Sequence, residues 1–216
     1  MTAFVIFVAA MFVLTVAAGL VSYRQDGRII NPLWYTWSVA HIVEIVFTTP
    51  AIVAAIRGRR LLKSILLGQL SIIGLVVIGL GAGFACVFFS TIVGLSYYEW
   101  PTFRSSGALE ASGALPITAY LLGPFGEEML YQGGLQTWLQ RFGPVIAVVG
   151  ATFPFWSFHL YGGFVPMRVA FYNLLPSMIA FAVIRQSTKS LGAAVLAHST
   201  YNVLVSFLVF VPRNSY

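Results

Sequence analysis

The sequence has very few charged residues. Asp, Glu, Lys and Arg make up only 8% of its 216 residues, whereas a soluble domain carries roughly 25%. So few charges cannot cover a surface that faces water, which excludes a soluble enzyme and a disordered chain. The formal net charge of +6 does not indicate a nucleic-acid partner. The 12 Lys and Arg residues lie between apolar runs, as the positive-inside rule predicts for membrane proteins.

Cysteine is almost absent as well. The single Cys86 excludes a disulfide framework and a metal site built from several thiolates. It lies inside an apolar run, so we interpret it as a small packing residue.

Long hydrophobic runs are what the sequence does have. Hydrophobic residues make up 59% of the chain, and a transmembrane helix needs about 20 of them in succession. We therefore predict an all-α polytopic membrane protein, a bundle of about seven transmembrane helices that forms a single transmembrane domain over residues 1–216. The predicted spans cover residues 2–22, 32–56, 64–98, 116–140, 144–161, 167–184 and 190–212.

The third predicted span is longer than one crossing needs. We interpret it as one tilted helix with an interfacial extension. Gly79 and Gly83 lie one turn apart in it, which favours close packing against another helix. The longest connection follows it, at Tyr97–Leu115.

The basic residues favour one orientation. Arg57, Arg59, Arg60 and Lys63 form a cluster, which we expect in a cytoplasmic loop. A cytoplasmic N-terminus places seven of the Lys and Arg residues inside and five outside. The short loops favour an integral, multi-pass protein of a prokaryotic cell membrane, with the lipid bilayer as its surroundings.

A few ionisable or amide residues interrupt the predicted spans. Such residues are costly inside a membrane, so each is a functional hypothesis. They are His41, Glu44, Glu127, Glu128, His159, His198 and Asn202. His41 and Glu44 share a helix face, and we interpret them as a structural pair; the alternative is that they line the same cavity or hold substrate.

The segment from Glu127 to Gln132 contains two adjacent carboxylates. Neighbouring helical residues point about 100° apart, so Glu127 and Glu128 cannot face the same direction. Gln132 follows Glu128 by one turn and can donate a hydrogen bond to it. Glu127 is then available as a general base. The alternative is that the two carboxylates mark a proton or cation pathway.

Two histidines lie on later spans. His159 follows several aromatic residues and is either a packing residue or a catalytic one. His198 and Asn202 are four residues apart and share a face, so both can donate a hydrogen bond to one oxygen. Such a pair stabilises an oxyanion or forms a polar contact between helices.

Taken together, these residues resemble the motifs of the CPBP family, the CAAX proteases and bacteriocin-processing enzymes, which are glutamic intramembrane proteases. The resemblance covers residues 115–210, a CPBP-like catalytic core. The family's three motifs, E-E-x-x-x-R, F-x-x-x-H and H-x-x-x-N/D, fall in this order on Glu127 and Glu128, Phe155 and His159, and His198 and Asn202. The arginine of the first motif is replaced by Gln132.

The resemblance implies hydrolysis of a peptide bond in a membrane-associated peptide or protein. In that reaction Glu127, assisted by His159, activates a water, and His198 and Asn202 hold the oxyanion. Glu128 and Gln132 have supporting roles, and no cofactor is needed. The alternative mechanism is a zinc-dependent one, with Zn²⁺ held by Glu127, His159 and His198.

Two other functions remain open on the sequence alone. A proton-coupled transporter would use the same buried carboxylates and histidines as a relay. A non-catalytic membrane scaffold or immunity protein would keep its phenotype when Glu127 is replaced by alanine.

Overall fold

The computed structural model describes residues 59–94, 102–103, 123–161, 170–206 and 208–209. The first two predicted spans, with His41 and Glu44, lie outside these residues. So does most of the long connection that begins at Tyr97.

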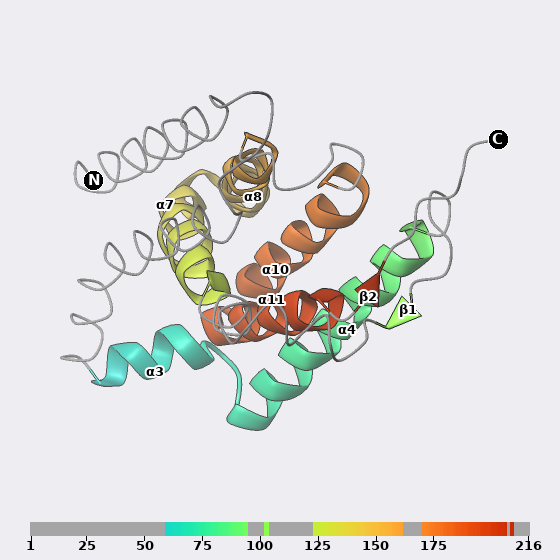
Figure 1. Ribbon diagram of the computed structural model, residues 1–216. Helices are drawn as coiled ribbons and strands as arrows, with labels where there is room; N and C mark the ends of the chain where they lie inside the picture. The colour runs from blue at the N-terminus through green and yellow to red at the C-terminus, as the bar shows by residue number, and fades with distance from the viewer. Residues whose placement is uncertain (1–58, 95–101, 104–122, 162–169, 207, 210–216) are drawn as a thin grey trace, which may run out of the picture.

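The described part of the chain is helical except for one short strand pair (Figure 1). Its helices are α3 (Arg59–Leu67), α4 (Ile72–Gly94), the π-helix η1 (Met129–Gln136), α7 (Thr137–Leu139), the 3₁₀ turn η2 (Gln140–Phe142), α8 (Pro144–Tyr161), the π-helix η3 (Ala170–Leu174), α10 (Leu175–Thr188) and α11 (Leu191–Ser206). Residues 123–128 form a further α-helical stretch that leads into η1. The strands are β1 (Thr102–Phe103) and β2 (Leu208–Val209).

The third predicted span is two helices and not one. α3 ends at Leu67 and α4 begins at Ile72. Gly68 between them has φ +58°, a conformation that favours glycine, and a Cβ there would collide with the backbone of Lys189. The prediction that Arg59, Arg60 and Lys63 lie in a loop is also wrong, because all three belong to α3.

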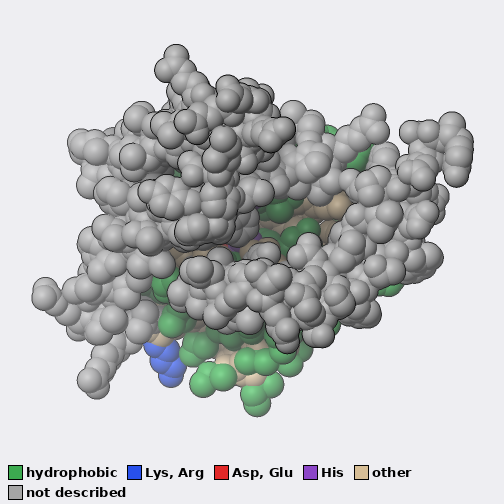
Figure 2. All heavy atoms as spheres, viewed as in Figure 1, with side chains coloured by type: hydrophobic (Ala, Val, Ile, Leu, Met, Phe, Trp, Pro, Cys, Tyr) green, Lys and Arg blue, Asp and Glu red, His purple; other side chains and the backbone are tan. Residues whose placement is uncertain are grey.

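α4 is long and apolar enough to cross a membrane. Only 17% of its most apolar stretch is buried inside the protein, and Ile73, Val77 and Phe88 are exposed on it. Figure 2 shows hydrophobic side chains gathered along the edge of the molecule where α4 lies. This apolar outer surface suits contact with lipid. Elsewhere in the described chain no helix meets the same criterion of length and composition, so the number of seven spans is not confirmed.

Helix α11 is central to the described part and packs on α4, α10, α3 and η1. Its contact with α4 depends on the two glycines predicted to favour close packing. A Cβ on Gly79 would lie 2.8 Å from the Cβ of Leu196, and one on Gly83 would lie 2.5 Å from the Cβ of Thr200. The prediction is therefore confirmed. Cys86 is buried in the same interface with Ala197 and Tyr201, as expected of a packing residue.

Three connections between helices lie together at one end of the described part. The backbone N–H of Gln69 donates to the carbonyl oxygen of Thr188 over 2.9 Å, and the hydroxyl of Ser190 donates to the carbonyl oxygen of Leu66. The side-chain amide of Gln140 donates to Gln186 over 3.3 Å. We call these connections, residues 67–71, 140–143 and 186–190, the basic end. Every Lys and Arg in the described ranges lies in or beside it, or in α3: Arg59, Arg60, Lys63, Arg141, Arg185 and Lys189.

The strand pair joins the connection after α4 to the segment after α11. Thr102 pairs with Val209 and Phe103 with Leu208 in antiparallel register. The last predicted span, 190–212, is therefore too long, because α11 ends at Ser206 and the chain then becomes extended. The sequence remains apolar through this change, so composition alone did not reveal the end of the helix.

Candidate active site

The first motif lies where an α-helix changes into a π-helix. Residues 123–128 are α-helical, and η1 begins at Met129, directly after Glu128. The predicted span 116–140 corresponds in its described part to this stretch together with η1 and α7. π-helical segments are rare and occur frequently at functional sites.

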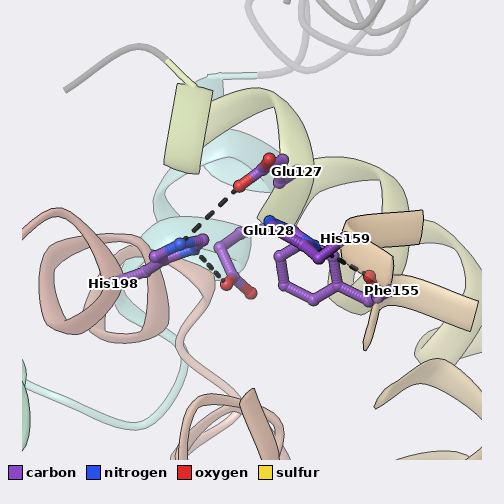
Figure 3. A network of polar contacts seen from close by, with 5 residues as sticks. All are labelled: Glu127, Glu128, Phe155, His159 and His198. Atoms are coloured by element: carbon purple, nitrogen blue, oxygen red, sulfur yellow. Dashed lines mark hydrogen bonds and ion pairs between the residues drawn. The ribbon is translucent and has the colours of Figure 1, made fainter. Parts of the chain in front are cut away.

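His198 lies between the two glutamates (Figure 3). Its Nδ1 is 2.9 Å from Oε1 of Glu128, a normal hydrogen-bond length. Its Nε2 is 3.6 Å from Oε2 of Glu127. All three side chains are buried, and a buried carboxylate is stable only when it is neutralised or paired. The imidazole of His198, on α11, therefore contacts the carboxylates of both Glu127 and Glu128, which lie on another helix.

His159 is fixed by its own helix. Its Nδ1 lies 3.0 Å from the carbonyl oxygen of Phe155, one turn earlier on α8. A carbonyl oxygen only accepts, so Nδ1 carries the proton, and Nε2 of the neutral ring carries the lone pair. This hydrogen bond sets both the tautomer and the direction of the ring.

Aromatic rings surround the two histidines. The ring of Phe155 makes edge contacts with both, at centroid distances of 5.2 Å to His159 and 5.7 Å to His198. Tyr131 stacks on Phe155 at 4.6 Å, and Phe181 stacks on His198 at 5.0 Å. The structure thus brings both histidines and both glutamates into one region, and an apolar surrounding of this kind strengthens electrostatic interactions within it.

Gln132 does not make the hydrogen bond predicted for it. Oε1 of Gln132 and Oε2 of Glu128 are both buried and have no hydrogen-bond partner in the described structure. The prediction assumed α-helical geometry, in which residues four apart lie one above the other. This segment is π-helical instead, so the α-helical spacing did not apply. Glu128 is held by His198 instead.

Asn202 follows His198 by one turn on α11 and is partly buried. No hydrogen bond of its side chain occurs in the described part of the structure. Its position on the same helix face agrees with the prediction, and its role as a second donor remains a proposal.

The alternative zinc site would consist of Glu127, His159 and His198. Among the described residues, no three His, Cys, Asp or Glu side chains lie so that they could hold a metal ion together.

Two features of the site were missed from the sequence. Phe181, which stacks on His198, carried no signal beyond its hydrophobicity. Gln136 is completely buried and donates from Nε2 to the carbonyl oxygen of Ala182 over 2.9 Å. Its spacing, four residues after Gln132 and eight after Glu128, is a signal that could have identified it.

Comparison of the sequence with known proteins and protein families gives a match to a family. No curated protein and no solved structure matches the chain significantly. Residues 110–204, however, match the family described as type II CAAX prenyl endopeptidase Rce1-like, which confirms over this part of the chain the resemblance to the CAAX proteases that the motifs indicated.

Proposed function

We propose that this protein is an intramembrane endopeptidase of glutamic type, which hydrolyses a peptide bond in a membrane-associated peptide or protein. The family match implies an endopeptidase of the CAAX type, a membrane-associated substrate and a location in a membrane. The single observation that carries the proposal is the contact of His198 with both Glu127 and Glu128, since it joins two of the three motifs at one point.

Glu127 is the general base in this proposal. It takes a proton from a water molecule, which then attacks the carbonyl carbon of the substrate, and it returns the proton to the leaving nitrogen. His159 assists by accepting a hydrogen bond from the same water at Nε2, the nitrogen left with a lone pair when Nδ1 donates to Phe155. The carboxylate and the imidazole together hold the water in place for attack.

His198 and Asn202 stabilise the oxyanion that forms. For this role Nε2 of His198 must carry a proton, so the pair of His198 and Glu128 holds two protons. One is on Nε2, and the other lies between Nδ1 and Oε1 of Glu128. Glu128 thus acts through His198, because it fixes the ring and supports its charge. Asn202, one turn further along α11, supplies a second donor for the same oxygen.

The apolar outer surface supports a substrate that approaches within the membrane. α4 exposes large aliphatic and aromatic side chains along its length, and the candidate site is surrounded by aromatic rings. We propose a prokaryotic cell membrane as the location, with several membrane crossings. The alternatives are a proton-coupled transporter and a non-catalytic scaffold or immunity protein.

Product analysis tests this function directly. The protein and a library of membrane-associated peptides are incorporated into lipid nanodiscs, and cleavage products are identified by mass spectrometry. We expect defined products with the wild type. We expect at least a roughly hundredfold lower rate with Glu127→Gln, since general-base catalysis contributes about 10²–10⁴-fold. Glu110→Gln, a carboxylate in the predicted loop, is the matched control and should retain activity.

The alternatives give different results in the same preparation. A transporter would leave every peptide intact and would move protons or solute along a gradient in a manner that depends on Glu127. A scaffold would show neither activity, and Glu127→Gln would leave its cellular phenotype unchanged. Either pattern would refute the proposed proteolysis.

A further inference from the structure

A row of polar residues leads away from the candidate site along one helix. Glu128, Gln132, Gln136 and Gln140 follow one another at intervals of four residues. In an α-helix each step of four overshoots a full turn by about 40°, so the row would wind around the helix. The π-helix η1, Met129–Gln136, has more residues per turn and offsets this drift. The first three members are buried, at 0%, 2% and 0% exposure, respectively.

Each of these three buried side chains has one oxygen without a hydrogen-bond partner among the described residues. Oε2 of Glu128, Oε1 of Gln132 and Oε1 of Gln136 have no hydrogen-bond partner within the described structure. All three atoms are acceptors when the carboxyl group is ionised. The orientation of Gln136 is fixed, because its Nε2 donates to the carbonyl oxygen of Ala182. A buried acceptor without a donor is costly, and three in one row indicate a missing donor of one kind.

The outer end of the row reaches the basic end of the protein. Nε2 of Gln136 and Nε2 of Gln140 both approach Oε1 of Gln186, at 3.4 and 3.3 Å. Gln140 and Gln186 are partly buried, and the neighbouring Arg141 is exposed. The row therefore connects a polar surface with the buried carboxylates.

We propose that Glu128, Gln132 and Gln136 bind a file of water molecules that supplies the hydrolytic water from the basic end. Water offers two donors, so one water molecule can bridge two successive acceptors of the row over ordinary hydrogen-bond distances. Buried waters typically satisfy such otherwise unpaired polar groups. The supply role rests on the proposed hydrolytic function, whereas the binding of water does not.

Substitution of Gln132 by methionine tests the proposal, because a row that binds water and a dry row predict different changes in kcat and in thermal stability. Methionine resembles glutamine in length but offers the water no comparable acceptor. If the row binds water, Gln132→Met interrupts it, and kcat falls about tenfold, the effect of losing one hydrogen bond, while KM changes less than about twofold. If the row is dry, the variant merely removes an unpaired buried oxygen, so kcat stays the same and thermal stability rises. That result would overturn the proposal.

Gln69→Met is the matched control. Gln69 is exposed and lies in the connection between α3 and α4. Its structural hydrogen bond uses the backbone N–H, which the substitution retains. Its kcat and stability should equal those of the wild type.

A second measurement tests the water without relying on proteolysis. In the full-length protein in nanodiscs, labelled with ¹⁵N-glutamine, magnetisation exchange between water and side-chain amides is recorded by NMR. We expect cross-peaks with water for Gln132 and Gln136, as for exposed Gln69, in the wild type and in Glu127→Gln. Their absence at Gln132 and Gln136 would refute the water file. Their presence in a protein that cleaves nothing would support the file and refute the proposed function.

A cation bound in place of the water molecules is the alternative, and it gives a different experimental result. Carboxylate and amide oxygens also coordinate Na⁺ or K⁺, so the wild type is assayed in choline chloride with both ions removed. Unchanged kcat and unchanged water cross-peaks support the water file. Loss of activity that either ion restores would overturn it in favour of a cation site.

Discussion

The two histidines of the site make hydrogen bonds of different kinds, and this difference predicts different costs of removing them. His198 contacts two buried carboxylates, whereas His159 bonds to a carbonyl oxygen of its own helix. Breaking a buried charged pair costs about 3–5 kcal/mol, while losing a neutral hydrogen bond costs about 1 kcal/mol. We expect His198→Phe to destabilise the protein more than His159→Phe, measured by reversible unfolding in mixed micelles.

A second substitution separates the charge from the packing. Adding Glu128→Gln to His198→Phe removes the carboxylate that was left without its partner, so part of the lost stability should return. Equal losses for the two single variants, or no recovery in the double variant, would show that the contact of His198 with Glu128 contributes little.

The residues of the site also predict the response to metal removal. Glu127 and His159 suffice to activate a water in the proposed mechanism. Within the described residues, moreover, no three suitable ligands come together. We expect activity to survive thorough chelation, as measured by initial cleavage rates before and after dialysis against a chelator. Stoichiometric zinc whose removal abolishes activity, and whose return restores it, would establish the zinc-dependent alternative.

Individual residues show which parts of the site were predictable. The cost of placing ionisable residues in a membrane identified Glu127, Glu128, His159 and His198, and these do lie in one region (Figure 3). The partner of Glu128 was not predictable, because it depends on how α11 approaches from a distant part of the sequence. Sequence spacing reports neighbours on one helix, whereas the contact with His198 is made across two.

At the scale of elements, helix winding limited the prediction. The apolar run of residues 144–161 predicted α8 with its observed bounds. Composition does not distinguish π from α winding, however, so the π-helix at Met129–Gln136 was missed. A single glycine with positive φ, Gly68, divides α3 from α4, and the hydrophobic pattern continues across it. Boundaries set by local backbone geometry were therefore the least predictable.

The packing of α4 on α11 should control the position of His198. A Cβ on Gly83 would lie 2.8 Å from the carbonyl oxygen of Ala197, the residue before His198, and this backbone cannot move aside freely. We expect Gly83→Ala to destabilise the protein by about 1–3 kcal/mol and to reduce the cleavage rate. Thermal melting in detergent and cleavage assays measure the two effects.

Gly81 provides a matched control on the same helix. A Cβ there meets nothing within 4 Å, and alanine is favoured over glycine inside a helix by about 1 kcal/mol. Gly81→Ala should therefore leave activity unchanged and keep or raise the melting temperature. A loss from Gly81→Ala as large as that from Gly83→Ala would indicate that helix propensity, and not the close contact, dominates.

At the scale of the whole molecule, the connections of the described part form two groups. Residues 67–71, 140–143 and 186–190 meet at the basic end through the bonds of Gln69 and Gln140. The strand pair of Thr102–Phe103 with Leu208–Val209 joins the connection after α4 to the segment after α11. The predicted alternation of spans would place the first group on one side of the membrane and the second on the other. Residues 67–71, however, lie inside the third predicted span, so the sequence did not predict this connection.

The grouping of the connections can be tested by labelling protein variants that each carry a single cysteine. Cys86 is buried, so the wild type should not react with an impermeant maleimide, and Cys86→Ala provides a background free of thiols. In that background we introduce Gln69→Cys, Arg141→Cys or Ser105→Cys. Because basic residues favour the cytoplasmic side, we expect the first two to react only in inside-out vesicles. The third, in the predicted outer connection, should react in intact cells. Labelling of Gln69→Cys and Arg141→Cys from opposite sides would refute the arrangement of spans, whereas labelling of both in intact cells would reverse only the orientation.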